Sequence, residues 1–156
     1  MRTPLLLPLL ASLLFVAFLS LPAQADEVPA LRLMTMTELK ANSGGHFVTN
    51  AAINGSDIVV LVDTGATAVA LSYEDASSAG LRPGSLDFDV PVSTANGIAR
   101  AARVTIDRIE VDGVKVEDVD GLVLPEGALR GTLLGMSFLG RLSSFKVEDG
   151  VLYLRD

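Results

Sequence analysis

The sequence contains three places where an Asn-Gly or Asp-Gly pair separates two short apolar runs: Asn54-Gly55, Asp112-Gly113 and Asp149-Gly150. Both residues of such a pair tolerate the positive φ that a two-residue hairpin turn requires, so each pair predicts a β-hairpin. The flanking runs are short and rich in β-branched residues. Repeated short strands joined by tight turns indicate an all-β domain, built as a sandwich or a closed barrel.

Further strands are predicted between and before these hairpins. They are expected over residues 47–53, 86–92 and 98–109, with a short one near 31–36. The segment 93–97 joins two of them. It is small and polar, with Asn96-Gly97 at its apex, and therefore predicts a mobile hairpin tip.

Helical patterns are few and short in this sequence. Residues 72–80 can form a helix with Ser72 as its N-cap, Asp75 at the third helical position and Gly80 as its terminator. A second short helix is expected within Met136–Leu142.

A carboxylate directly follows one of the strand-like runs. Val59–Val62 is apolar and β-branched, which predicts a buried strand, and Asp63-Thr64-Gly65-Ala66 comes next. Asp63 would be held on a rigid element beside an apolar wall, where it can act as an acid or a base. Asp and Gly also suit ordinary turns, but a turn needs neither the apolar run before it nor the small-residue strand 68–71 after it. The flanks therefore favour a catalytic role.

The run 61–67 resembles the active-site loop of aspartic peptidases, and Ala66 makes it most similar to the retroviral kind. The order and rough spacing of later features agree from about His46 onward. A hairpin tip comes first, and the apolar pair Leu133-Leu134, a glycine, a short helix and a final hairpin follow. The segment 133–142 is particularly similar to bacterial, exported, single-domain retropepsin-like peptidases.

This resemblance implies a closed retropepsin-like β-barrel with a flap hairpin and one or two short helices, over residues 44–156. It also implies an aspartic endopeptidase that uses neither a metal nor a cofactor. The implied site consists of Asp63 as the catalytic acid, Thr64, Gly65 and Ala66 as its support, Thr94, Ala95, Asn96 and Gly97 as the flap, and Leu133, Leu134 and Gly135 as the wall of the substrate cleft.

This chemistry needs two carboxyl groups, because one takes a proton from water while the other protonates the carbonyl oxygen of the peptide. The chain has one Asp-Thr-Gly. Asp112, Asp120 and Asp149 also precede glycine, but we expect them in polar hairpin turns. The second carboxylate is therefore expected from another copy, in an isologous homodimer with Asp63 on its two-fold axis. An extended peptide or protein is the expected substrate.

One departure from the retroviral pattern stands out. Those enzymes carry an Asp after the alanine and an Arg after the later glycine, and the two residues pair within a subunit. Here Thr67 and Met136 occupy the positions. Both charges are missing together, so neither is left alone in the interior.

Three other interpretations are weaker or remain open. A serine hydrolase would use Ser137 with His46, the only histidine, but the glycine after Ser137 is at the wrong spacing for a nucleophile elbow. Residues 117–121 resemble a calcium loop without its terminal glutamate, and a solvated hairpin explains them better. A non-catalytic dimeric module of the same fold, acting as a binding or scaffold protein in the cell envelope, remains the alternative function.

The N-terminal residues predict export. Residues 1–25 match a secretory signal peptide, with Arg2, an apolar stretch over 5–21 and a small-residue cleavage site. An uncleaved membrane anchor through 5–21 is the alternative. Residues 26–43 are expected to form a linker with an N-terminal strand. We therefore expect the protein in the periplasm or cell envelope, with membrane contact only if this segment is retained.

The composition narrows the possible partners. The formal net charge is −7, which argues against nucleic acid and anionic membrane surfaces as partners. The chain has no cysteine, so disulfides and thiolate metal sites are excluded.

Overall fold

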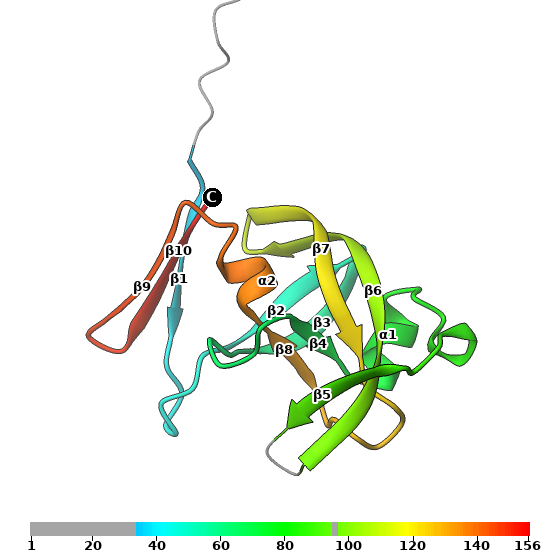
Figure 1. Ribbon diagram of the computed structural model, residues 1–156. Helices are drawn as coiled ribbons and strands as arrows, with labels where there is room; N and C mark the ends of the chain where they lie inside the picture. The colour runs from blue at the N-terminus through cyan, green and yellow to red at the C-terminus, as the bar shows by residue number, and fades with distance from the viewer. Residues whose placement is uncertain (1–33, 95–96) are drawn as a thin grey trace, which may run out of the picture. The chain divides into compact units, whose positions relative to one another are not determined.

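Six strands form a closed ring, in which each strand pairs with its two neighbours. The computed structural model describes residues 34–94 and 97–156 (Figure 1), so the predicted signal segment and the flap residues Ala95 and Asn96 lie outside the described residues. The six strands are β2 (Val48–Ile53), β3 (Ser56–Val62), β8 (Thr132–Leu134), β4 (Val69–Leu71), β7 (Val114–Val123) and β6 (Gly97–Val111), in this spatial order. Strand β6 then pairs with β2 through Ile109 and Ile53. The predicted closed, all-β barrel is thus confirmed.

The three predicted hairpin turns are present. Asn54, Asp112 and Asp149 each have a φ of 50°, and the glycine after each also has a positive φ. The strand pairs that these turns join are in register up to the turn itself, for example Ile53 opposite Ser56. Local turn chemistry therefore sets three of the strand registers in this fold.

The strand before Asp63 differs from its prediction. Val60 is fully buried, but its neighbour Val59 is 62% exposed. Alternate residues of a strand face opposite sides of the sheet, and one side of a barrel wall faces outward. The expectation of a run buried throughout is therefore wrong. Val59, Leu61 and Asp63 alternate with the core residues along β3.

Strand β5 (Val90–Thr94) is not part of the closed ring and pairs with the first residues of β6 alone. The two form the hairpin predicted from the Asn96-Gly97 apex, with Thr94 opposite Gly97. The strand begins later than residue 86 because Leu86 and Phe88 pack against the core instead of pairing. A 3₁₀ turn (η1, Pro83–Ser85) precedes this stretch.

Both predicted helices are present. Helix α1 spans Tyr73–Ser78, and the Ser72 hydroxyl caps it by accepting the Asp75 N–H at 3.1 Å. Helix α2 spans Met136–Leu139, within the range predicted for it. Its last turn closes when the Gly140 N–H donates to the Met136 carbonyl.

The region 117–121 lies in the second strand of the β6–β7 hairpin, with Glu117, Asp118 and Asp120 exposed, as the solvated-hairpin interpretation expects. The expectation that Asp120 lies in a hairpin turn is wrong, because Asp120 pairs with Thr105 inside the strand. Asp118 has a φ of 52° and is not itself paired, but the register of β6 and β7 is the same on both sides of it. The Arg141 guanidinium donates to the carbonyls of Glu117 and Asp118, at 2.5 and 2.9 Å, and so supports the backbone at this position.

A second sheet is built from the two ends of the described chain. It has the order β1 (Met36–Lys40), β10 (Val151–Arg155), β9 (Ser144–Glu148), and all its pairs are antiparallel. Strand β1 lies further along the chain than the strand predicted near 31–36, because its partner β10 determines its position. The compact unit that contains both sheets spans Leu33–Asp156.

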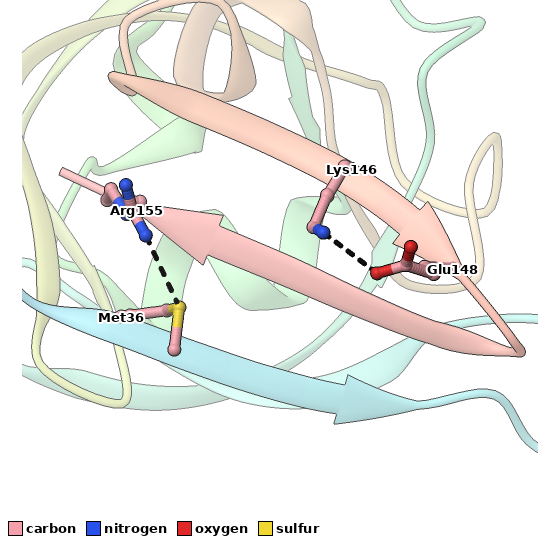
Figure 2. A network of polar contacts seen from close by, with 4 residues as sticks. All are labelled: Met36, Lys146, Glu148 and Arg155. Carbon is pink, nitrogen blue, oxygen red and sulfur yellow. Dashed lines mark hydrogen bonds and ion pairs between the residues drawn. The ribbon is translucent and has the colours of Figure 1, made fainter.

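The outer face of this second sheet carries exposed polar contacts (Figure 2). Lys146 pairs with Glu148 at 2.8 Å, and on the neighbouring strands Arg155 approaches the sulfur of Met36. The hydrogen bond between Lys146 and Glu148 raises the pKa of Lys146 and lowers the pKa of Glu148. Both side chains are open to solvent, so salt screens the pair and it adds little stability. The buried residues of this sheet, such as Leu152 and Leu154, belong to the same hydrophobic core as the barrel.

Across residues 34–94 and 97–156, no helix is both long enough and apolar enough to span a membrane.

The contrast between Val60 and Val59 gives a direct test of the β3 orientation. Val60→Ala removes fully buried methyl groups and should lower the free energy of unfolding by about 2 kcal/mol. Val59→Ala, on the exposed side of the same strand, should change it by less than about 0.5 kcal/mol. Urea unfolding of the two variants measures both. Equal losses would contradict the strand orientation.

Candidate active site

Asp63 lies immediately after β3, next to the parallel strand β8. Its backbone N–H donates to the Leu134 carbonyl at 3.1 Å, which continues the β3–β8 pairing by one residue. The carboxylate oxygen Oδ1 accepts the N–H of Gly65 at 2.8 Å. The main chain therefore holds both the position and the orientation of this carboxylate.

Gly65 lies close to the carboxylate that it binds. A Cβ at this position would lie 3.1 Å from Asp63 Oδ1, so the carboxylate would have to shift by a few tenths of an ångström. The glycine thus lets the backbone approach the acid closely.

The loop after Asp63 packs on the residues that follow β8. The Met136 N–H donates to the Ala66 carbonyl at 2.8 Å. A Cβ on Gly135 would lie 2.2 Å from the carbonyl oxygen of Ala68 and 2.7 Å from that of Ala66. Since backbone atoms cannot give way as a side chain can, Gly135 is the residue that allows this contact.

A cavity of about 750 Å³ opens beside Asp63. Strand β5 of the flap hairpin contributes Pro91–Thr94 to its lining, and the β8 residue Leu133 contributes an apolar side chain. Among the described residues that line it, Asp63 is the only ionisable one. A single carboxylate in a flap-lined hollow with both polar and apolar walls is suited to bind an extended chain beside an acid–base group.

A second, smaller hollow of about 260 Å³ adjoins this cavity. It lies against the exposed face of β2 and β3 at Val48 and Val59, and its lining is almost wholly apolar. Leu129 and Leu133 line both hollows. Apolar surface therefore continues outward from the acid.

The structure brings some of the predicted site residues to the cavity and not others. Asp63, Gly65 and Ala66 of the loop line it. Thr64 is exposed beside them, and within the described part of the chain its hydroxyl has no hydrogen-bond partner. Gly97, at the start of β6, has a φ of 110° and closes the described part of the flap.

The predicted cleft wall divides in the same way. Leu133 lines the cavity, whereas Leu134 is fully buried in the core. Gly135 packs against the backbone of the loop that follows Asp63. Adjacent strand residues face opposite sides, so Leu133 and Leu134 cannot both face the cavity.

Several cavity residues were not predicted as site residues from the sequence. They are Thr67, Ala68, Ala70, Pro91, Val92, Ser93, Leu122, Leu124, Ala128 and Leu129. Most are ordinary small or apolar residues, and only the pairing of β4 with β7 and β8 brings their segments together. Alternation of inward and outward residues along β5 could at most have indicated Val92 as a residue that faces the cavity.

The serine hydrolase interpretation does not fit the geometry. The Ser137 hydroxyl donates to the Asp120 carbonyl at 2.6 Å and accepts the Val69 N–H at 2.9 Å, so both of its roles are already used. His46 lies in an exposed turn and its backbone N–H donates to Asn42. Neither residue lines the cavity. Within residues 34–94 and 97–156, no three His, Cys, Asp or Glu side chains gather as a metal site.

A sequence profile of the family described as "gag-polyprotein putative aspartyl protease" matches residues 49–141, more than half of the chain. The chain belongs to this aspartyl protease family. The matched segment contains the Asp63 loop, strand β5 of the flap hairpin and Leu133, all of which contribute residues to the cavity lining.

Known structures agree with this assignment. A retropepsin-like aspartic protease from Rickettsia conorii superposes with a TM-score of 0.71 at 33% identity, covering 79% of this chain and 92% of that one. The EIAV protease, in complex with the inhibitor HBY-793, gives a TM-score of 0.57 at 22% identity and covers 70% and 100% of the two chains. The second likeness shows the fold alone. The fold is thus the predicted retropepsin-like barrel.

Sequence relatives are less informative about activity. An uncharacterized Sinorhizobium protein from the cobV 5' region is 46% identical over 112 residues, or 72% of this chain and 48% of that protein. The chain spans about half the length of the curated relatives it matches.

Gly135 and Gly131 form a matched pair for testing the loop contact. Gly135→Ala places a methyl group against two backbone carbonyls and should lower the free energy of unfolding by about 2–3 kcal/mol. Gly131→Ala meets no atom within 4 Å and should change it by less than about 0.5 kcal/mol. Denaturant unfolding followed by circular dichroism compares the two. Equal stability would show that the loop does not rest on Gly135.

Proposed function

We propose that this protein is an aspartic endopeptidase whose active site forms between two copies of the chain. The observation that carries the proposal is the Asp63 carboxylate, held by the Gly65 N–H on the wall of a flap-lined cavity. The aspartyl protease family and the similarity to a Rickettsia conorii retropepsin-like aspartic protease support it.

In the proposed reaction, the two Asp63 carboxyl groups share one proton. The ionised carboxylate takes a proton from a water molecule, and that water attacks the peptide carbonyl carbon. The protonated carboxyl donates its proton to the carbonyl oxygen, which gives a neutral gem-diol. Proton transfer to the amide nitrogen then lets the carbon–nitrogen bond break. No covalent intermediate forms with the protein.

The homodimer follows from the number of acids. Among the described residues that line the cavity, Asp63 is the only acid, and the reaction needs two. Asp112 and Asp149 lie in hairpin turns, and Asp120 lies in β7 outside the cavity lining. A two-fold axis that passes beside Asp63 would supply the second carboxylate from the same position of the other copy.

The proposed substrate is an extended peptide with apolar side chains around the cleaved bond. Strand β5 lines the cavity and offers its main chain beside such a peptide. Leu133 and Leu129, which line both hollows, favour apolar side chains on the substrate. We place this activity outside the cytoplasm, in the periplasm or cell envelope, on the basis of the signal-like N-terminal sequence.

The decisive experiment compares Asp63→Asn with the wild type on a peptide pool across pH. Asn keeps an oxygen that can accept the Gly65 N–H, so the fold should survive. It cannot exchange the proton, so cleavage should fall by at least about 10²-fold. The wild-type pH profile should be bell-shaped with an acidic optimum, because activity requires one carboxyl protonated and the other ionised.

Asp120→Asn is the matched control, since Asp120 also precedes glycine but lies in β7, away from the cavity lining. It should retain wild-type cleavage. Equal activity of wild type and Asp63→Asn would refute the proposal. Inactivity of the wild type at every pH would favour the alternative, a dimeric binding or scaffold module of the same fold.

Dimer formation is tested separately by dilution. If each active site needs two chains, specific activity should fall once the protein concentration drops below the dimer dissociation constant. Activity and mass are measured on the same dilution series, by peptide cleavage and by sedimentation. Undiminished specific activity in samples shown to be monomeric would contradict a shared site.

A further inference from the structure

The loop that follows Asp63 is attached to the segment after β8 at three evenly spaced points. The Asp63 N–H donates to the Leu134 carbonyl, and the Ala66 carbonyl accepts the Met136 N–H. At the third point, the Val69 N–H donates to the Ser137 hydroxyl at 2.9 Å. The first two attachments use main-chain groups and do not depend on side-chain identity. The third depends on one side chain.

The Ser137 hydroxyl also joins two strands where their pairing ends. Strands β4 and β7 run parallel and begin to pair at Val69 and Gly121. The hydroxyl accepts the Val69 N–H and donates to the Asp120 carbonyl at 2.6 Å, so it spans the gap beyond the first pair. A hydroxyl has one proton to donate and lone pairs to accept with, so both bonds form at once.

Alanine at position 137 would leave the Val69 N–H without its partner. Val69 is fully buried, so bulk water cannot readily replace the hydroxyl. The backbone between the second and third attachments, at Thr67 and Ala68, lines the cavity beside Asp63. Movement of Val69 would therefore displace the neighbouring residues of the active-site loop.

We propose that Ser137 is a positioning residue that fixes the exit of the Asp63 loop by fastening β4 to β7. This inference rests on the proposed peptidase activity for its functional consequence. Ser137 does not line the cavity and takes no part in bond cleavage. Its hydroxyl keeps the Asp63 carboxylate and the adjoining cavity wall in one geometry.

The test compares Ser137→Ala with Ser137→Thr, which keeps the hydroxyl. A displacement of about 1 Å at a catalytic group can cost about 10²-fold in rate. We therefore expect Ser137→Ala to lower kcat by about 10- to 100-fold with little change in KM, and Ser137→Thr to restore most of it. Assays are run well below the measured Tm of each variant, so that the unfolded fraction cannot account for the loss.

Ser78→Ala is the matched control. The Ser78 hydroxyl donates to the Glu74 carbonyl within α1 and is exposed, so its loss should leave kcat unchanged. If Ser137→Ala does not fold, Ser137→Cys keeps the size and weakens both bonds, and it should give an intermediate kcat. Wild-type kcat in a folded Ser137→Ala, or in Ser137→Cys where alanine does not fold, would overturn the proposal.

Amide hydrogen exchange gives a readout that does not require activity. Exchange at Val69 should accelerate about tenfold in Ser137→Ala, while exchange at Leu152 in the second sheet should not change. Unchanged protection at Val69 would overturn the positioning role even if the wild type proves inactive. An inactive wild type with accelerated Val69 exchange would refute the proposed peptidase activity and retain the attachment.

Discussion

The parallel pairing of β3 with β8 is the constraint on which the site depends. Main-chain hydrogen bonds carry it from Val60 to Val62, and the bond from the Asp63 N–H to the Leu134 carbonyl extends it by one residue. Asp63 therefore lies directly at the end of a rigid strand of the barrel wall. The chain then turns back over Gly135, which has no side chain to block the contact. Removing either strand from this pair would leave Asp63 on an unsupported loop.

The flap is a continuation of the same barrel wall. Strand β6 runs from Gly97 to Val111, and one part of it pairs with β5 while the rest pairs with β7 and β2. The hairpin that lines the cavity is thus anchored to the barrel through a single long strand, β6, which pairs with both β7 and β2. Ile106 and Ile109 of this strand are fully buried, whereas Ile98 near its start is 81% exposed. Burial decreases toward the tip, so the barrel holds the base of the flap firmly and its tip only weakly.

The features predicted correctly from the sequence are those that depend on neighbouring residues. The turns at Asn54, Asp112 and Asp149 and the Ser72 cap each need only a few adjacent side chains, and all four are present.

Features that depend on distant partners could not be predicted in this way. The parallel pairs of β3 with β8 and β4 with β7, and the position of β1 opposite β10, are set by residues far along the chain. The contact of the Arg141 guanidinium with the Asp118 carbonyl similarly joins residues far apart in the chain. The acid itself was found because a strand and a loop motif coincide locally, whereas Leu122 and Leu129 line its cavity through tertiary contacts alone.

The attachment of the Asp63 loop explains how the chain does without the charged pair of retroviral enzymes. Thr67 and Met136 stand at those two positions. Met136 packs against the core, and its N–H bonds to the Ala66 carbonyl. Ser137, the next residue, supplies the side-chain contact through Val69 and Asp120. All of these groups are amides or a hydroxyl, which do not titrate in the acidic range. An Asp–Arg pair would weaken as its carboxyl took up a proton. The loop in this protein is therefore held by contacts that persist under the acidic conditions in which a pair of carboxyl groups can share a proton.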